Sequence, residues 1–174
     1  MLRLVKPLKL ASIFDQRCMS ETHETSKNIN WRIKILRIKM VLKIKSQHLE
    51  KIFHHARKCY PLEACGILVG RVKGEERVVT EVYHTKNMLA SSSSYQIDPI
   101  EQLRVFEKAE LMNLNVLGFY HSHPFWDSYW SKADDEASKL WIGYVFLIIS
   151  LKKEEVNAYI RKQEGVKNED IVIL

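Results

Sequence analysis

The chain of 174 residues contains three cysteines, an odd and small number, and no apolar stretch long enough for a secretory signal or a membrane span. So few cysteines in a chain of this length exclude a fold that depends on a disulfide framework, although a bond between Cys59 and Cys65 stays open. Internal repeats and interdomain linkers are also missing. These absences predict a reduced, cytoplasmic protein with one folded domain.

Net positive charge is missing from most of the chain. Of 27 Lys/Arg and 21 Asp/Glu, nine basic and three acidic residues lie in residues 1–39, which leaves 18 of each sign in residues 40–174. Because binding to phosphate groups needs clustered cations on the folded surface, we expect no nucleic-acid partner and no membrane partner for residues 40–174.

Residues 1–39 are predicted to be a basic extension that the fold does not need, and the domain is predicted to begin at Met40. Two alternatives stay open: the extension is a tether to nucleic acid or membrane, or residues 31–35, which alternate apolar and basic side chains, are an edge strand.

Two histidines stand at the end of an apolar, aromatic run over residues 116–120 that is typical of a strand. Side chains alternate along a strand, so His121 and His123 leave the same face, and Pro124 ends the strand because it has no N–H. A His-x-His pair alone more often marks a half-buried strand end than a metal site. With Asp134 as third ligand, however, a fourth tetrahedral position stays open for water, which is the pattern of catalytic zinc.

Two further residues favour the metal hypothesis. Ser131 lies three residues before Asp134, where its hydroxyl can cap a helix and hold the aspartate in the first turn. Glu63 leads into the apolar residues 64–70, and a carboxylate in such a setting is costly unless it has a partner. We therefore expect both residues beside the metal.

These residues and their spacing resemble the JAMM/MPN+ metallopeptidases, whose signature is an upstream Glu, then His-Ser/Thr-His-Pro, then Ser-x-x-Asp. Ten residues separate His123 from Asp134, as the pattern requires, and the resemblance covers about residues 40–174. Trp130 departs from the pattern, because many members carry proline there; this concerns the rigidity of the loop and not the ligands. The residues that carry the resemblance are Glu63, His121, Ser122, His123, Pro124, Ser131 and Asp134, supported by Glu63-Ala64-Cys65-Gly66 and Tyr95-Gln96-Ile97-Asp98-Pro99.

The order of the expected elements predicts an α/β layer fold with helices on a mixed sheet. The resemblance implies the MPN architecture, a mixed curved β-sheet flanked by helices and akin to cytidine deaminase. The deaminases' own His-x-Glu and Cys-x-x-Cys signature is missing, so base deamination is disfavoured. The expected strands are 41–45, 65–69, 77–83, 116–123, 144–151, 156–161 and 171–174, and the expected helices are 46–60 (capped by Ser46), 99–113 (capping box of Asp98 and Glu101) and 131–141.

The resemblance implies a zinc-dependent isopeptidase of the compact prokaryotic type. Its substrates would be conjugates of ubiquitin-like or sulfur-carrier proteins, cleaved after a C-terminal Gly-Gly tail. His121, His123 and Asp134 would hold Zn²⁺, Glu63 would be the general base, and Ser131 would donate to the oxyanion or hold the loop as a helix cap.

Two other functions stay open. A non-catalytic MPN scaffold is disfavoured because all three ligands and the glutamate are present. A nucleic-acid-associated relative resembling RadC is disfavoured because residues 40–174 have no net charge. The sequence makes no prediction of the oligomeric state.

Overall fold

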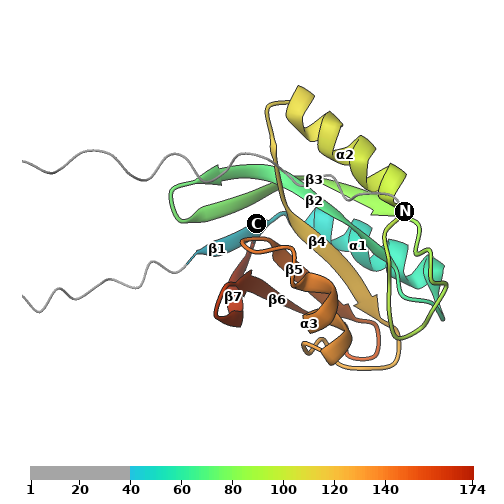
Figure 1. Ribbon diagram of the computed structural model, residues 1–174. Coiled ribbons are helices and arrows are strands. Elements are labelled where there is room, and N and C mark those ends of the chain that lie inside the picture. The colour runs from blue at the N-terminus through green and yellow to red at the C-terminus, as the bar shows by residue number, and fades with distance from the viewer. Residues whose placement is uncertain (1–39) are drawn as a thin grey trace, which may run out of the picture. The chain divides into compact units, whose positions relative to one another are not determined.

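The computed structural model describes residues 40–174, so the predictions for residues 1–39 lie outside the described residues. In the described part the strands follow the order β1-β3-β2-β4-β5-β6-β7 around a closed sheet, with three helices (Figure 1). The strands are β1 (Val41–Ile44), β2 (Cys65–Lys73), β3 (Glu76–Thr85), β4 (Asn115–His123), β5 (Val145–Ser150), β6 (Glu155–Lys162) and β7 (Gly165–Ile173), and the helices are α1 (Ser46–Cys59), α2 (Pro99–Leu111) and α3 (Lys132–Ser138).

The sheet is mixed, and the short strand β1 closes it. β1 pairs in parallel with both β3 and β7, and β4 pairs in parallel with β5, while the other neighbours are antiparallel. The α/β class and the mixed sheet with helices are therefore confirmed. The closure of the sheet by β1 was not predicted. The four residues of β1 alternate in burial, but this pattern does not indicate which strands lie beside them.

Helices α1 and α2 cover opposite faces of the sheet, as Figure 1 shows. The alternation along β4 divides the core in the same way. Tyr120 packs with Ile52 and Ala56 of α1, whereas Phe119 packs with Val105 and Ala109 of α2. The face that carries Phe119 also carries the two predicted histidine ligands, so the candidate site lies on the side opposite α1.

The predicted cap of α1 is wrong. Ser46 is the first helical residue, and the N-cap position is held by Lys45, whose side chain makes no capping bond. The backbone supplies one acceptor instead, because Ser46 N–H donates to the carbonyl of Leu174 at 2.9 Å.

The start of α2 is confirmed in part. Asp98 is the N-cap, its carboxylate accepts from Ile100 N–H at 2.8 Å, and Pro99 occupies the first helical position. Glu101 does not complete the expected capping box, because its carboxylate accepts from the backbone N–H of Lys86 at 2.9 Å. A long-range bond to the end of β3 thus replaces a local one.

Element lengths differ from the prediction at several places. β2 continues to Lys73 rather than ending at residue 69. β7 begins at Gly165 rather than at 171, because its first residues are polar and hide the strand pattern. α3 ends at Ser138 rather than near 141, since Trp141 leaves the helix to pack its ring on Phe119 at 4.7 Å. Among residues 40–174, no helix has the length and apolar character needed to cross a membrane.

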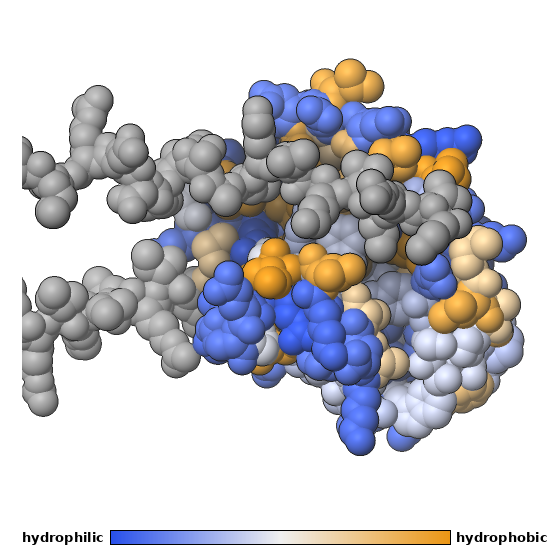
Figure 2. All heavy atoms as spheres, viewed as in Figure 1, coloured by the Kyte–Doolittle hydropathy of each residue, from blue (hydrophilic) through white to orange (hydrophobic). Residues whose placement is uncertain are grey.

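The outer side of α2 keeps apolar residues exposed. Ile100, Leu103 and Leu111 all lie more than half exposed. Figure 2 shows apolar side chains over this helix as separate patches among hydrophilic ones rather than as one continuous surface.

Candidate metal centre

The predicted ligands come together where β4 ends. His121 and His123 project from β4, and Asp134 reaches them from the first turn of α3, which lies in the crossover between the parallel strands β4 and β5. The two imidazole Nε2 atoms are 3.2 Å apart, and Nε2 of His121 is 3.1 Å from Oδ1 of Asp134. All three side chains are buried, with one candidate ligand atom of each within 4.8 Å of the others.

This arrangement fits a metal ion better than a hydrogen-bond network. Nε2 of His121 faces both the His123 nitrogen and the Asp134 oxygen, and a single hydrogen cannot satisfy both contacts. Zinc bonds of about 2.0–2.1 Å in a tetrahedron place neighbouring ligand atoms about 3.3–3.4 Å apart, close to the two separations observed here. Two imidazoles and a carboxylate are also the donor types that zinc takes.

Ser131 holds Asp134 in place. It is the N-cap of α3 in a complete capping box: the hydroxyl donates to Oδ2 of Asp134 at 2.6 Å and accepts from Asp134 N–H at 3.1 Å. The predicted cap is confirmed, and Oδ1 of Asp134 is left to face His121. Burial alone would raise the pKa of Asp134, but the His121 imidazole and the Ser131 donors hold it at about 2. The carboxylate is thus ionised and aimed at the histidines.

The tautomer of His123 follows from its backbone contact. Its Nδ1 lies 2.7 Å from the carbonyl oxygen of Asp127, and a carbonyl can only accept, so Nδ1–H is the donor. Burial, together with the nearby His121, lowers the pKa of His123. A neutral ring that is protonated at Nδ1 presents the Nε2 lone pair to a metal.

His121 is enclosed by an aromatic ring. Tyr95 stacks on it with ring centroids 4.6 Å apart, and the register of β2 with β4 places Cys65 opposite. Burial lowers the pKa of His121, but the carboxylates of Asp134 and Glu63 outweigh it and leave the pKa raised. Sequence reasoning noted Tyr95 only as part of the resemblance; an aromatic residue in a polar loop carries no signal for this contact.

Glu63 lies on the same side of the sheet, just before β2. The adjacent residue Ala64 donates its N–H to the Ser122 hydroxyl at 2.9 Å and accepts from Ser122 N–H, so the β2–β4 pairing continues towards Glu63. Glu63 is 3 % exposed, and burial raises its pKa to about 7, with the His121 imidazole lowering it and Asp134 raising it. A carboxyl group with a pKa near neutrality can both take up and release a proton.

Asn87 supports Glu63, and sequence reasoning missed it. Its amide nitrogen donates to the carbonyls of Glu63 at 3.0 Å and Ser94 at 3.1 Å, while its oxygen accepts from the backbone N–H of Leu89 and Gln96. One side chain thus joins residues 87–96 to the glutamate. An asparagine in a loop indicates a local turn, and nothing in the sequence points to the long-range contact.

The remaining acids near the motif have other partners, and the two cysteines of the described residues are not bonded to each other. The Asp127 carboxylate pairs with Lys153 at 2.7 Å, and Asp135 pairs with Arg161 at 2.9 Å. Cys59 and Cys65 are both free thiols, which answers the question of a bond between them.

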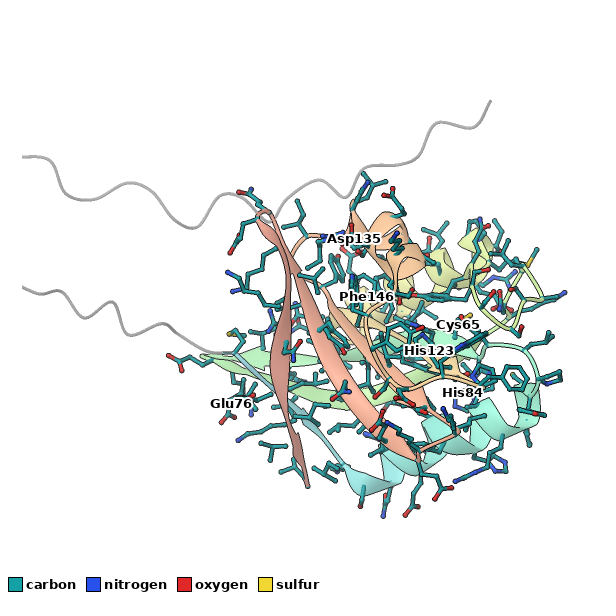
Figure 3. The ribbon with its side chains drawn as sticks, turned by 90° about the horizontal axis from the view of Figure 1, so that it is seen from below. Cys65, Glu76, His84, His123, Asp135 and Phe146 are labelled. Carbon is teal, nitrogen blue, oxygen red and sulfur yellow. The ribbon has the colours of Figure 1, made fainter. Side chains whose placement is uncertain are left out.

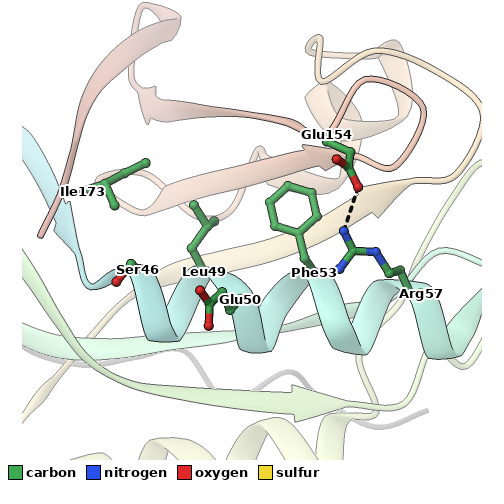
Figure 4. A pocket seen from close by; sticks show the side chains of 7 residues that line it. All are labelled: Ser46, Leu49, Glu50, Phe53, Arg57, Glu154 and Ile173. Carbon is green, nitrogen blue, oxygen red and sulfur yellow. Dashed lines mark hydrogen bonds and ion pairs between the residues drawn. The ribbon is translucent and has the colours of Figure 1, made fainter.

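A groove of about 400 Å³ lies apart from the metal centre (Figure 4). It runs along α1 towards Glu154, which pairs with Arg57 at 2.8 Å at one end. Its lining is Ser46, Leu49, Glu50, Phe53, Arg57, Glu154 and Ile173, which includes none of the predicted site residues.

The fold and the site together define an α/β domain that has a buried His-His-Asp group at a strand end and a glutamate of raised pKa beside it. These features place the chain in the class of proteins that have a candidate centre for metal-dependent hydrolysis.

Within that class the chain belongs to the family described as prokaryotic homologs of the JAB domain, whose profile matches residues 45–162. The recognition of a prokaryotic-type JAMM/MPN member is thereby confirmed.

Named relatives support this placement. The desampylase of Haloferax volcanii is 37 % identical over 106 residues, which cover 58 % of this chain and 74 % of that protein. The CysO-cysteine peptidase of Mycobacterium tuberculosis is 34 % identical over 94 residues, which cover 54 % and 63 %. A solution structure from Desulfitobacterium hafniense superposes with a TM-score of 0.71 at 31 % identity, covering 77 % of this chain and 93 % of that one.

Proposed function

We propose that this chain is a zinc-dependent isopeptidase that removes ubiquitin-like or sulfur-carrier proteins from their conjugates after a C-terminal Gly-Gly tail. The observation that carries the proposal is the convergence of His121, His123 and Asp134 beside a glutamate whose pKa is about 7. The names of the desampylase and CysO-cysteine peptidase relatives support the substrate class.

In the proposed mechanism a zinc ion, when bound, would supply a water with a pKa of about 7 as the nucleophile at neutral pH. His121, His123 and Asp134 would hold the ion. Glu63 takes the proton of the attacking water and passes it to the leaving amine, which its raised pKa suits. The Ser131 hydroxyl keeps Asp134 oriented by donating to its Oδ2. Because the hydroxyl has a single hydrogen, its proposed donation to the oxyanion requires that this bond to Asp134 be released.

Exposed aromatic side chains beside the site support a protein substrate. Phe125, Trp126 and Tyr129 lie within six residues after His123 and are 41–50 % exposed. Tyr60, also exposed, makes an edge contact with Phe125 at 5.5 Å, and the Tyr129 ring lies 5.5 Å from that of His123. Large apolar groups exposed next to a candidate active site are typical of surfaces that bind another protein.

The proposal is tested with a small β-grasp protein that ends in Gly-Gly and is joined to a lysine of a reporter. We expect one zinc per chain by metal analysis, cleavage after the second glycine, loss of cleavage with a chelator, and recovery when Zn²⁺ is restored. The matched substrate carries bulky residues in place of the two glycines and should be resistant. Equal cleavage of both substrates would exclude recognition of the tail in a narrow groove.

The same samples decide between the alternatives. A scaffold would bind the reporter without cleaving it at any metal concentration. A RadC-like nucleic-acid protein would bind DNA with an affinity that falls as salt rises.

A further inference from the structure

Strand β6 presents two chemically different faces. Val156 and Ala158 pack into the core that α1 covers. The side chains at the alternate positions share the other face, because side chains alternate along a strand. This second face carries four side chains with polar groups: Glu155, Asn157, Tyr159 and Arg161. All four hydrogen-bond to the segment 128–138, which follows the two histidines and ends with α3.

Three of the four bind one residue, Ser128, which is fully buried. Glu155 Oε1 accepts from both the backbone N–H of Ser128 at 3.1 Å and its hydroxyl at 3.0 Å. Asn157 Nδ2 donates to the hydroxyl oxygen at 2.7 Å, and the Tyr159 hydroxyl donates to the Ser128 carbonyl at 3.0 Å. The hydrogen-bonding groups of Ser128 are therefore all bound from one strand. Its neighbour Asp127 supplies the carbonyl that fixes His123.

Arg161 binds the helix that carries Asp134. Its guanidinium donates to the backbone carbonyl of Asp135 at 2.5 Å, to the Asp135 carboxylate at 2.9 Å and to the Ser138 hydroxyl at 3.0 Å. Arg161 is only 7 % exposed, and a planar guanidinium with several fixed donors constrains the direction of what it binds. Figure 3 shows Asp135 on α3 and His123 at the strand end.

We propose that the polar face of β6 is a positioning element that sets the geometry of His123 and Asp134 for metal binding. Ser128 acts through the Asp127 carbonyl, and Arg161 acts through the first turns of α3. The metal role of these ligands rests on the proposed function. Groups that hydrogen-bond a metal ligand change its metal affinity by about 10–100-fold when they are removed. The β6 side chains act one contact further away, so we expect effects at the lower end of this range.

The first test compares the zinc affinity of variants by competition with a chromogenic chelator. Ser128→Ala and Arg161→Leu should bind Zn²⁺ about 10-fold more weakly. Arg77→Leu is the matched control, because Arg77 makes a comparably buried ion pair with Glu169, at 2.7 Å, between β3 and β7. We expect the control to melt at a lower temperature with wild-type zinc affinity. Tyr159→Phe removes one hydroxyl and is the mild variant if Ser128→Ala does not fold; it should weaken zinc binding about 2–3-fold, within the loss of one hydrogen bond.

The second test needs no metal. ¹⁵N NMR of the metal-free chain should report a single tautomer of His123, protonated at Nδ1, in the wild type and in Arg77→Leu, and a mixture in Ser128→Ala. If the wild type binds no zinc, the proposed function fails and this tautomer alone decides the positioning role. If the wild type binds zinc and cleaves its substrate while all variants keep its zinc affinity and its tautomer, the positioning role is excluded and the proposed function stands.

Discussion

At the scale of single residues, the proposed roles of metal ligand and proton carrier belong to different side chains and can be tested separately. Glu63→Gln keeps the size of the side chain but cannot take up a proton. We expect its zinc content to match the wild type while turnover falls by about 100-fold or more. His123→Ala should lose zinc and activity together, because two ligands bind zinc poorly.

Zinc stoichiometry, melting temperature and initial rate on the same samples distinguish a base from a structural carboxylate. If Glu63 were structural, Glu63→Gln would be less stable, and its activity would follow the folded fraction. A folded, zinc-loaded and fully active Glu63→Gln protein would contradict the mechanism.

Asn87 gives a second prediction at this scale. Asn87→Asp keeps the oxygen that accepts from Leu89 and Gln96 but replaces the donor to the Glu63 carbonyl by a repelling oxygen. We expect a loss of about 1–3 kcal/mol of stability, a fall in kcat/KM of about 10-fold, and unchanged zinc content. Ser93→Ala in the same loop is the control and should match the wild type. Equal kcat/KM for both variants would show that the loop does not position Glu63.

At the scale of elements, α1 is joined to β4 by a polar contact at the edge of the core. Nδ1 of His55 lies 2.8 Å from the hydroxyl of the buried Tyr120, and His84 stacks on His55 at 4.2 Å. Gly66 makes the space, since a side chain there would collide with the Tyr120 ring and the Tyr83 carbonyl. The alternation that points His121 to the metal centre therefore points Tyr120 to the helix.

This contact predicts an acid-sensitive helix. Burial, followed by repulsion from His84, His54 and Lys58, lowers the pKa of His55 from 6.5 to about 4. A base whose pKa is lower in the folded state contributes stability that is complete above about pH 6.5 and is lost as the pH falls towards 4. We expect urea unfolding to show a loss of about 1–2 kcal/mol between pH 7 and 4.5, less than the full shift because water screens the half-buried ring.

His55→Gln should remove the share of this loss that belongs to His55, whereas His54→Gln, at the exposed neighbouring position, should retain it. Burial also lowers the pKa of His48, His84 and His123, so part of the loss remains in both variants. The same pH dependence in both variants would assign the loss to other groups.

At the scale of the whole molecule, β1 is the first described element that a truncation from the N-terminal side would remove. Because β1 closes the sheet between β3 and β7, we expect removal of residues 1–39 to leave melting temperature and peptidase activity nearly unchanged. Removal of residues 1–45 deletes β1 and should lower the melting temperature by roughly ten degrees or more. In a domain of this size such a shift corresponds to a loss of several kcal/mol in the free energy of unfolding. A large loss after the shorter truncation would show that residues before Met40 are an integral part of the fold.

The sequence by itself determined several local features of this protein. The alternation at His121 and His123, the cap formed by Ser131 and the end of α1 before Pro61 are relations between residues two to four positions apart, and the chain folds as these relations predict. The family could be recognised for the same reason, since its signature is a set of spacings.

Only the tertiary structure decided which distant residues meet. Closure through β1, the bond of Glu101 to Lys86, the attachment of Glu63 to Asn87 and the binding of Ser128 by β6 all join segments far apart in the chain. A polar side chain can hydrogen-bond equally well to many chemically similar partners, so the residue type alone does not predict which partner it binds. The packing of the sheet brings one partner within reach, and that choice determines how the ligands and the glutamate are held.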